Sequence, residues 1–336
     1  MASGKPESLK LVAERPRPEV VFALRRLPGT RRLIFGGSDF LVRDLDLDRT
    51  QAEPGVLGRH ESYVTGIALA GGGRWAVSGG YDGRLIWWDL EADSRVRALD
   101  AHRKWVRRVV ATPDGATIAS VADDMVCRVW DVESGRLLHE LRGHDERTPH
   151  QFPSMLFACA ISPDGAHLAT GDKVGHVVVW DLASGRSLAT LDAPTLYTWD
   201  PVQRRHSIGG IRSLAFAPGG DLLAVGGIGK IGNIDHLEGP ARVEVFDWRR
   251  GERTHELASD KLKGLVEHLS FHPAGDWLLA AGGANDGFAL FLDLKAKNII
   301  LQEKMPMHVH GVVLDEGSGG FVAAGHGKIA AYRIVS

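Results

Sequence analysis

A pattern of short strands that recurs seven times constrains the fold of this 336-residue chain more than any other feature. Each occurrence is an apolar run that ends in an aromatic residue and Asp, or in a variant of that pair, at intervals of 40 to 66 residues. The seven pairs are Arg43-Asp44, Trp88-Asp89, Trp130-Asp131, Trp180-Asp181, Phe246-Asp247, Leu292-Asp293 and Tyr332-Arg333. Repeats of this length are typical of propellers and solenoids, in which neighbouring units bury one continuous core. The pattern therefore predicts a single repeat domain.

Each repeat is predicted to contain four short antiparallel strands. In the third repeat the strands cover residues 106–111, 117–120, 126–130 and 137–141. The turn Pro113-Asp114-Gly115 separates the first two, and turns rich in Gly or Pro stand at the same place in other repeats. The strands are β-branched and apolar on both sides, as expected of a sheet packed between two neighbours. The sequence therefore predicts an all-β protein.

Two repeats carry a set of four polar residues at matching places. The sets are His60, Ser78, Asp82 and Trp88 in the second repeat, and His102, Ser120, Asp124 and Trp130 in the third. On these residues the chain resembles the WD40-repeat β-propeller family over nearly its whole length, and a bacterial-type subgroup of that family is expected. The resemblance implies that each set forms a hydrogen-bonded brace. The fourth and fifth repeats have Val174 and Pro240 at the Asp position, so they are expected to lack part of the brace.

The resemblance and the repeat count predict a seven-bladed β-propeller, closed by an N-terminal strand that completes the last blade. Residues 308–336 supply only three strands, so the apolar run at 8–13 is expected to add the fourth and remove an exposed edge. Residues 1–7 are predicted to be disordered, and residues 8–336 to form one domain; a linear solenoid is the alternative. The predicted blades cover residues 20–57, 60–100, 102–143, 154–192, 208–258, 264–303, and 308–336 with 8–13.

Charge and hydropathy exclude several classes of function. The 40 basic and 42 acidic residues give a net charge of -2, which favours neither nucleic acid nor a membrane surface as a partner. No signal-like N-terminal segment and no apolar run of about 18 residues occur, so a cytoplasmic protein is expected. Cys127 and Cys159 lie in apolar runs, which predicts buried free thiols. We expect no cofactor, and a monomer when no partner is bound.

Three insertions interrupt the repeat and mark a candidate binding surface. The turn positions place eight extra residues within 145–153, 13 between Pro194 and Pro218, and 11 within 226–240. The resemblance implies that these connections leave the ring on one face and form a ridge over the fourth and fifth blades. Tyr, Trp and Arg, which are frequent in interface hot spots, occur in it. The ridge residues are Arg147, His150, Phe152, Tyr197, Trp199, Asp200, Arg204, Arg205, His206, Asp235, His236 and Glu238.

Two other interpretations of the insertions stay open. In the first, the loops fold down to complete the fourth and fifth blades, with Trp199 as a plug and His206 in the place of a structural His. In the second, the glycine-rich run 226–232 cradles a phosphate. That run lacks the strand-to-helix unit which such sites use, and a flexible hairpin explains its glycines.

A second candidate site is the mouth of the central channel. Seven residues share one offset from the turn of their repeat and are expected near the start of the innermost strands: Phe22, Thr65, Arg107, Phe157, Arg212, Glu267 and His310. Arg107, Arg212 and His310 face a single glutamate there, so the mouth is predicted to be positive and to hold an acidic or phosphorylated segment. In the alternative, Arg107, Arg212 and Glu267 pair with one another.

No motif for catalysis or metal binding stands out. The chain has no Gly-x-Ser-x-Gly elbow, and neither cysteine lies in a His-paired motif. Among the 15 histidines, those near the ridge and His308, His310 and His326 of the last repeat show no tight ligand spacing, so no metal site is predicted. The predicted function is a non-enzymatic scaffold that binds a protein or peptide on the ridge and channel mouth. The alternative is a small-molecule or metal-dependent enzyme with a His and Asp site under the ridge.

Overall fold

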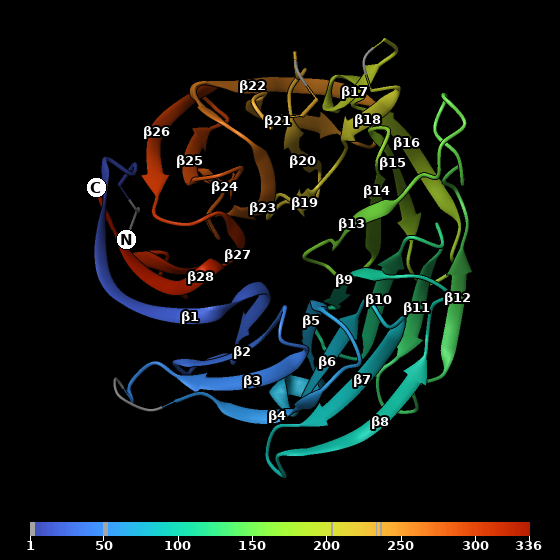
Figure 1. The fold of residues 1–336 in the computed structure, drawn as a ribbon, viewed down its shortest axis with the longest axis vertical. Coiled ribbons are helices and arrows are strands. Elements are labelled where there is room, and N and C mark those ends of the chain that lie inside the picture. The colour runs from blue at the N-terminus through green and yellow to red at the C-terminus, as the bar shows by residue number, and fades with distance from the viewer. Residues whose placement is uncertain (1–3, 50–52, 203, 233, 236) are drawn as a thin grey trace.

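The computed structural model describes residues 4–49, 53–202, 204–232, 234–235 and 237–336. These residues form an all-β ring of sheets around a central channel (Figure 1). The innermost strands line this channel, which is a cavity of about 500 Å³. The helices of the described chain are the short 3₁₀ turns η1 (Gly71–Gly73) and η2 (Pro194–Leu196), and neither has the length or hydropathy to cross a bilayer.

The strands are short and follow one another closely along the chain. The first half of the chain contains β1 (Ser8–Arg26), β2 (Arg32–Gly37), β3 (Leu41–Asp46), β4 (Gly55–Arg59), β5 (Val64–Ala70), β6 (Trp75–Gly80), β7 (Arg84–Asp89), β8 (Ser94–Asp100), β9 (Val106–Ala111), β10 (Thr117–Ala122), β11 (Cys127–Asp131), β12 (Leu137–Leu141) and β13 (Leu156–Ile161). The second half contains β14 (His167–Asp172), β15 (His176–Asp181), β16 (Ser187–Asp192), β17 (Tyr197–Asp200), β18 (His206–Gly209), β19 (Ser213–Phe216), β20 (Leu222–Ile228), β21 (Pro240–Asp247), β22 (Glu252–Lys263), β23 (Leu265–Phe271), β24 (Leu278–Gly283), β25 (Gly287–Asp293), β26 (Asn298–Met305), β27 (Val309–Leu314) and β28 (Gly320–Val335).

Five four-stranded sheets and one six-stranded sheet make up the ring in the described part of the chain. In the four-stranded sheets, neighbouring strands pair antiparallel in chain order: β5–β8, β9–β12, β13–β16, β19–β22 and β23–β26. The order of the six-stranded sheet is β27-β28-β1-β2-β3-β4, and β17 and β18 form a separate hairpin. This architecture is an all-β propeller, as predicted, and β9–β12 match the strands expected in the third repeat to within two residues.

The number of blades differs from the prediction because of the long strand β1. Its first part pairs with β28, from Ser8 opposite Val335 onward, and its last part pairs with β2, through Arg26 opposite Leu33. The predicted pairing of residues 8–13 with the last repeat is therefore present. However, this shared strand joins the first and last predicted units into one sheet, so the prediction of seven separate blades is wrong and the structure has six. The two halves of this sheet still pack against each other, because Phe35 and Val322 lie in one buried cluster.

The N-terminal segment that was predicted to be disordered lies only partly within the described residues. Residues 1–3 lie outside them. Of the remaining four, Lys5 places its Nζ 2.7 Å from the Asp293 carboxylate, and the Glu7 amide donates to the carbonyl of Val335.

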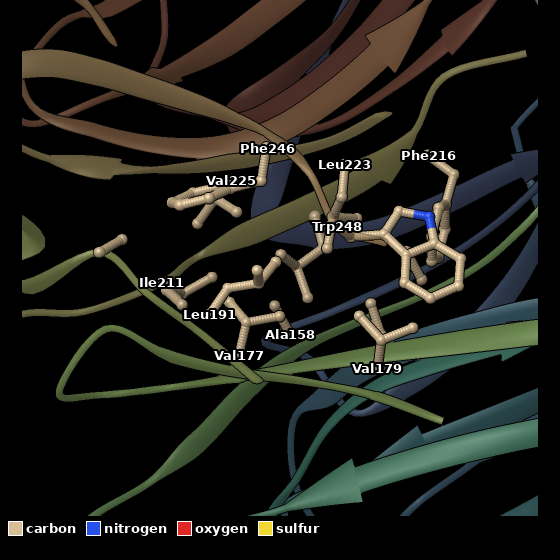
Figure 2. Close-up of a cluster of buried hydrophobic side chains, with 14 of the residues drawn as sticks. Ala158, Val177, Val179, Leu191, Ile211, Phe216, Leu223, Val225, Phe246 and Trp248 are labelled. Atoms are coloured by element: carbon tan, nitrogen blue, oxygen red, sulfur yellow. The ribbon is translucent and has the colours of Figure 1, made fainter. Parts of the chain in front are cut away.

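Apolar side chains fill the spaces between neighbouring sheets. In Figure 2, Val177 and Val179 of β15 face a cluster that includes Leu223 of β20 and the indole of Trp248. Val178 points to the opposite side of β15 and joins the cluster shared with the β9–β12 sheet. Successive side chains of a strand point to opposite faces, so a strand buried on both faces must be apolar throughout.

Both cysteines are buried and free, as predicted. Burial raises the pKa of the Cys159 thiol to about 12 and raises that of Cys127 well above its ordinary value. A thiol that stays protonated is a poor nucleophile, so neither cysteine is a candidate for covalent chemistry.

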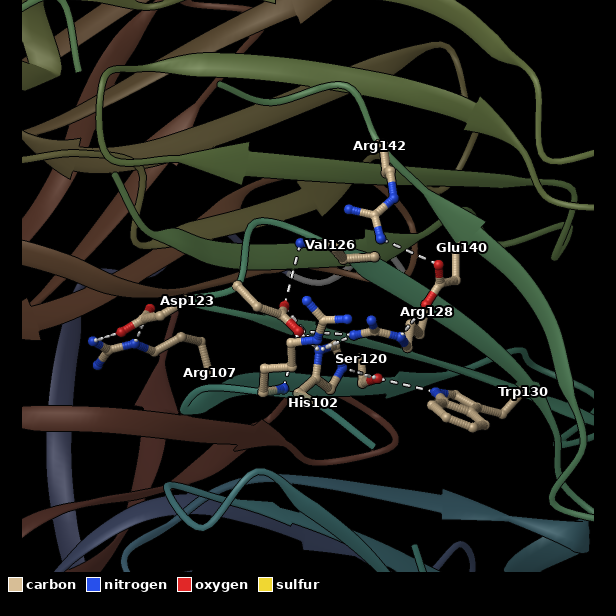
Figure 3. Close-up of polar contacts among 11 residues, drawn as sticks. His102, Arg107, Ser120, Asp123, Val126, Arg128, Trp130, Glu140 and Arg142 are labelled. Carbon is tan, nitrogen blue, oxygen red and sulfur yellow. Dashed lines mark hydrogen bonds and ion pairs between the residues drawn. The ribbon is translucent and has the colours of Figure 1, made fainter. Parts of the chain in front are cut away.

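The polar brace implied by the resemblance is present in the second and third repeats. In the third, His102 Nδ1 lies 3.1 Å from Asp124 and His102 Nε2 lies 2.8 Å from Ser120 Oγ, which also accepts a hydrogen bond from Trp130 Nε1 (Figure 3). Arg128 donates to Asp124 from the side. Burial alone would raise the pKa of the Asp124 carboxyl, but the hydrogen bonds and charges of His102 and Arg128 lower it below its ordinary value.

The fourth repeat has a complete brace, contrary to the prediction. His144 Nδ1 lies 3.0 Å from the carboxylate of Asp172, and Thr170 Oγ1 bridges His144 Nε2 and Trp180 Nε1. Asp172 stands two residues before Val174 and reaches the same histidine atom from the end of β14. The brace carboxylates of the third and fourth repeats therefore contact the same histidine atom from different offsets along the chain.

Replacement of the third brace carboxylate is expected to destabilise the fold. Asp124→Ala leaves His102 and Arg128 without their shared acceptor, so the free energy of unfolding should fall by about 1 to 3 kcal/mol. The control is Arg204→Ala on the exposed ridge, which should leave the unfolding curve unchanged. Urea titrations followed by tryptophan fluorescence measure both. Equal losses in the two variants would contradict the assignment of Asp124 as a brace and of Arg204 as a surface residue.

Candidate functional site

The structure brings the three insertions together on one side of the ring. His150 of the first insertion lies with Nδ1 3.0 Å from the Tyr197 hydroxyl of the second. Thr198 Oγ1 of the second accepts a hydrogen bond of 3.1 Å from the amide of Ile231 in the third. The second insertion forms the β17–β18 hairpin, which thus stands between the other two.

The aromatic residues of the ridge pack on one another. The His150 ring stacks on Trp199 at 4.0 Å between centroids, and Phe152 lies 5.4 Å from Trp199 and 6.4 Å from His206. Trp199 is half-buried by these contacts, and His206 is exposed. The residue that plugs the core from this insertion is Leu196, which is fully buried among the side chains of Figure 2's cluster.

The charged groups of the ridge are largely satisfied within it. Arg204 donates to the Asp235 carboxylate at 2.8 Å, and Glu238 lies 3.8 Å from Lys263. The Asp200 carboxylate accepts a hydrogen bond from the amide of Val202, and Arg147 donates one to the carbonyl of Gln151. Arg205 is exposed with a left-handed backbone, and His236 lies outside the described residues. The ridge therefore offers aromatic surface more than free charge.

The channel mouth forms as predicted from the offset of the repeats. All seven predicted residues line one cavity of about 150 Å³, together with Tyr81 and Arg108. Among them, the pKa of His310 lies well below its ordinary value because of burial and the nearby charges of His308 and His326. The geometry does not by itself assign a ligand to this cavity.

Arg107 is paired within the protein, in partial agreement with the alternative of internal pairing. Its Nε donates to one carboxylate oxygen of Asp123 and its Nη2 to the other, both at 2.7 Å (Figure 3). Its Nη1 donates to the Tyr81 hydroxyl. The partner is thus Asp123 and not Glu267. Burial would lower the pKa of Arg107, but the hydrogen bonds to Asp123 outweigh it and raise the pKa.

Among the described residues, no carboxylate pairs with Arg212 or Arg108 in this way. The Arg212 guanidinium lies over the ring of Phe157 at 3.9 Å, and its buried Nε has no hydrogen-bond partner among the described residues. Burial lowers the pKa of Arg212, and the charge of Glu267 opposes this. Arg108 donates only to the carbonyls of Arg212 and Glu267, and no ion pair joins either arginine to a described carboxylate. Both arginines line the mouth cavity together with Glu267, so their two positive charges exceed its one negative charge there.

A row of aromatic side chains beside the mouth escaped the sequence analysis. Phe40, Tyr63, Tyr81 and Trp105 follow one another at centroid separations of 5.7, 5.6 and 4.4 Å. We call these four residues the aromatic row. Tyr63 is 40% exposed and Trp105 48%, and Trp105 borders a pocket of about 410 Å³ with Lys104. The sequence does contain a pattern that indicates this row, since Tyr63 and Trp105 each stand directly before an innermost strand.

The one group of three metal-ligating side chains found within the described ranges lies on the last repeat and not under the ridge. The ligand atoms of His308, His310 and His326 all lie within 4.8 Å of one another. Their spacing along the chain did not predict that these three side chains meet. The ridge shows no comparable group in the part of the chain that the structure describes.

A ring of antiparallel sheets around a central channel defines a β-propeller. The sequence model of the WD domain, G-beta repeat, matches residues 53–89, 93–131 and 135–181, which contain most of the second to fourth repeats. These matches, with the braces of those repeats, support the WD40 repeat family for this chain.

Curated relatives agree with this family. Protein groucho of Drosophila melanogaster is 26% identical over 230 residues, which cover 68% of this chain and 26% of that protein. Nuclear distribution protein PAC1-2 of Uncinocarpus reesii is 29% identical over 173 residues, 45% of this chain and 33% of that protein. The human U3 small nucleolar RNA-interacting protein 2 is 35% identical over 102 residues, which cover 30% of this chain and 22% of that protein. The match thus spans a third or less of these relatives, and since they are eukaryotic, a bacterial-type subgroup is not supported.

Proposed function

We propose that this chain is a non-enzymatic scaffold that binds a protein or peptide segment across the aromatic row and the channel mouth. The WD40 repeats and the similarity to proteins such as groucho support an interaction role. The near balance of charge argues against nucleic acid as the direct ligand, although one relative is named for interaction with an RNA. We place the protein in the cytoplasm as a monomer.

The half-exposed indole of Trp105 carries the proposal. It stacks on Tyr81 with an interplanar angle of 4°, and the Arg107 guanidinium lies 5.3 Å from the Trp105 ring. Asp123 fixes that guanidinium with two hydrogen bonds, so the indole stands on a rigid base. Exposed aromatic area that is already ordered loses little entropy on binding, which is the property of hot-spot residues.

The partner segment is proposed to carry an acidic side chain. Arg212 and Arg108 make the cavity at the mouth positive, and their hydrogen bonds to the described chain leave donors over. Phe152 and His150 of the ridge then flank the same segment, since the first insertion leads directly to Met155 at the pocket beside Trp105. The ridge is thus proposed as the second part of the binding surface.

Replacement of Trp105 tests this proposal. Trp105→Ala is expected to weaken binding of a partner captured with the wild-type chain by at least about tenfold. The control is Leu188→Ala, because Leu188 is 45% exposed but lies on the outermost strand β16. Titration calorimetry at low and high salt measures both the affinity and the contribution of an acidic group.

The arms of the experiment separate the two surfaces. If Trp105→Ala weakens binding of the partner and Phe152→Ala does not, the site is restricted to the aromatic row. If only Phe152→Ala weakens binding, the site lies on the ridge. Binding that is unchanged in both variants contradicts a site on the aromatic row or the ridge. Binding that does not change with salt concentration contradicts an acidic partner segment.

A further inference from the structure

Three histidines from different places in the last repeat meet beside the channel mouth. His308 stands directly before β27, His310 lies within it and His326 lies in β28. The ring centroids are 4.5 Å apart between His308 and His310, and 5.1 Å from each of these to His326. The amide of His326 donates to the carbonyl of His308, which fixes the two backbones together.

The backbone around His308 selects the tautomer that a metal ion needs. His308 Nδ1 lies 3.0 Å from the carbonyl oxygen of Ala284. A carbonyl only accepts, so Nδ1 carries the proton and the neutral ring presents the lone pair of Nε2. A hydrogen bond from the second ring nitrogen to a carbonyl is the usual way in which proteins orient a metal-ligating histidine.

Two of these ligand atoms are buried without a partner. His308 is only 7% exposed, and its Nε2 accepts no hydrogen bond from any described group; the same holds for His310 Nε2. A buried polar atom without a partner has lost its hydrogen bonds to water and gained none in exchange, which destabilises the fold. Two such atoms facing a third imidazole point to a ligand that satisfies all three.

At the corresponding places of the third repeat, the buried polar groups have hydrogen-bond partners. Trp105, Arg107 and Asp123 occupy the third-repeat positions of His308, His310 and His326, since the Asp123 amide bonds to the Trp105 carbonyl as His326 does to His308. In that repeat Arg107 and Asp123 satisfy each other. The last repeat has three imidazoles instead and no carboxylate among these three positions.

We propose that His308, His310 and His326 bind one divalent transition-metal ion of the borderline class, such as Zn²⁺. Imidazole nitrogens are preferred ligands of Zn²⁺, Co²⁺, Ni²⁺ and Cu²⁺, whereas Ca²⁺ and Mg²⁺ take oxygen. Bonds of about 2.0 to 2.1 Å in a tetrahedral site require the nitrogens to lie about 3.3 Å apart. The exposed His326 ring, next to the turn at Gly327, supplies the adjustment from 4.8 Å. Three ligands leave one position open beside the cavity that His310 lines.

Titration of the tag-free, chelator-treated full chain with Zn²⁺ tests the site. Isothermal calorimetry should give one equivalent for the wild type, and Ca²⁺ should give no heat of binding. His326→Ala should lose affinity by about 10- to 100-fold or more, since loss of a direct ligand is at least as severe as loss of a supporting group. His326 is exposed, so this variant should fold, which circular dichroism checks. His206→Ala, an exposed ridge histidine, is the matched control.

Each outcome decides the proposal. One equivalent of Zn²⁺ that is lost in His326→Ala and kept in His206→Ala supports it. No binding by the wild type overturns it, and so does binding that His326→Ala leaves unchanged, because the ion would then lie elsewhere. Visible spectra of the Co²⁺-loaded wild type and His308→Ala give a second readout, and an identical spectrum in the two chains overturns the assignment of His308.

Discussion

Deletion of residues 1–14 is expected to cause aggregation and a loss of roughly 3 to 5 kcal/mol in the free energy of unfolding. The segment from Ser8 onward pairs with β28, and Leu9 packs on the buried apolar cluster that contains Phe321 and Tyr332. Without it, several backbone hydrogen bonds of about 1 kcal/mol each and the burial of Leu9 are lost. The C-terminal part of β28 also becomes an exposed edge, which promotes pairing between molecules.

Size-exclusion chromatography and thermal unfolding measure this effect. A deletion of residues 1–3 alone is the control, because it leaves β1 whole. A synthetic peptide of residues 1–16 added in excess to the truncated chain should restore a monodisperse species, since strand addition repairs an open edge. If the longer truncation has the melting temperature and dispersity of the full chain, the ring does not depend on β1 for closure.

Removal of Glu244 is expected to cost about 3 to 5 kcal/mol of folding free energy. Its carboxylate is fully buried and accepts hydrogen bonds from Arg242 Nε at 2.8 Å and Arg253 Nη1 at 2.9 Å. Glu244→Ala leaves the buried Arg242 without its buried counter-ion. The fifth repeat has Pro240 where the second and third repeats have a brace Asp, and this buried ion pair lies on its strand β21.

Glu256 provides a matched control for the buried carboxylate. It contacts the same two arginines but is exposed, so Glu256→Ala should cost less than about 1 kcal/mol. The double variant Glu244→Ala with Arg242→Leu should recover part of the loss, since an apolar pair replaces an unpaired charge. Guanidinium titrations measure all three. Similar losses in the two single variants would show that burial of Glu244 carries no special cost.

Residues that act within one repeat were predictable because their partners stand at fixed offsets along the chain. The His102 and Ser120 brace was implied by the resemblance to the WD40 family, in which these residue types stand at fixed offsets within a repeat. The fourth brace was missed because Asp172 reaches His144 from a different position in the chain. The shared distance along the chain from the turn of each repeat also placed Arg107, Arg212 and His310 at the channel mouth.

Contacts between repeats and between loops were not predictable in the same way. The partner of Arg107 is Asp123 and not Glu267, because the side chain turns toward its own sheet. The stacking of Tyr81 on Trp105 joins neighbouring sheets, and their distance depends on how the ring closes.

The sequence by itself determined that the chain forms antiparallel sheets around a channel, since apolar periodicity and turn residues specify strands locally. The offsets between repeats also predicted the residues of the channel mouth, and the resemblance to the WD40 family implied the braces of the second and third repeats. Only the tertiary structure decided that β1 joins the first and last units into one sheet and that His308, His310 and His326 converge. The reason is physical: strand pairing at ring closure and side-chain direction at the rim depend on contacts between residues far apart in the chain, which local pattern does not encode.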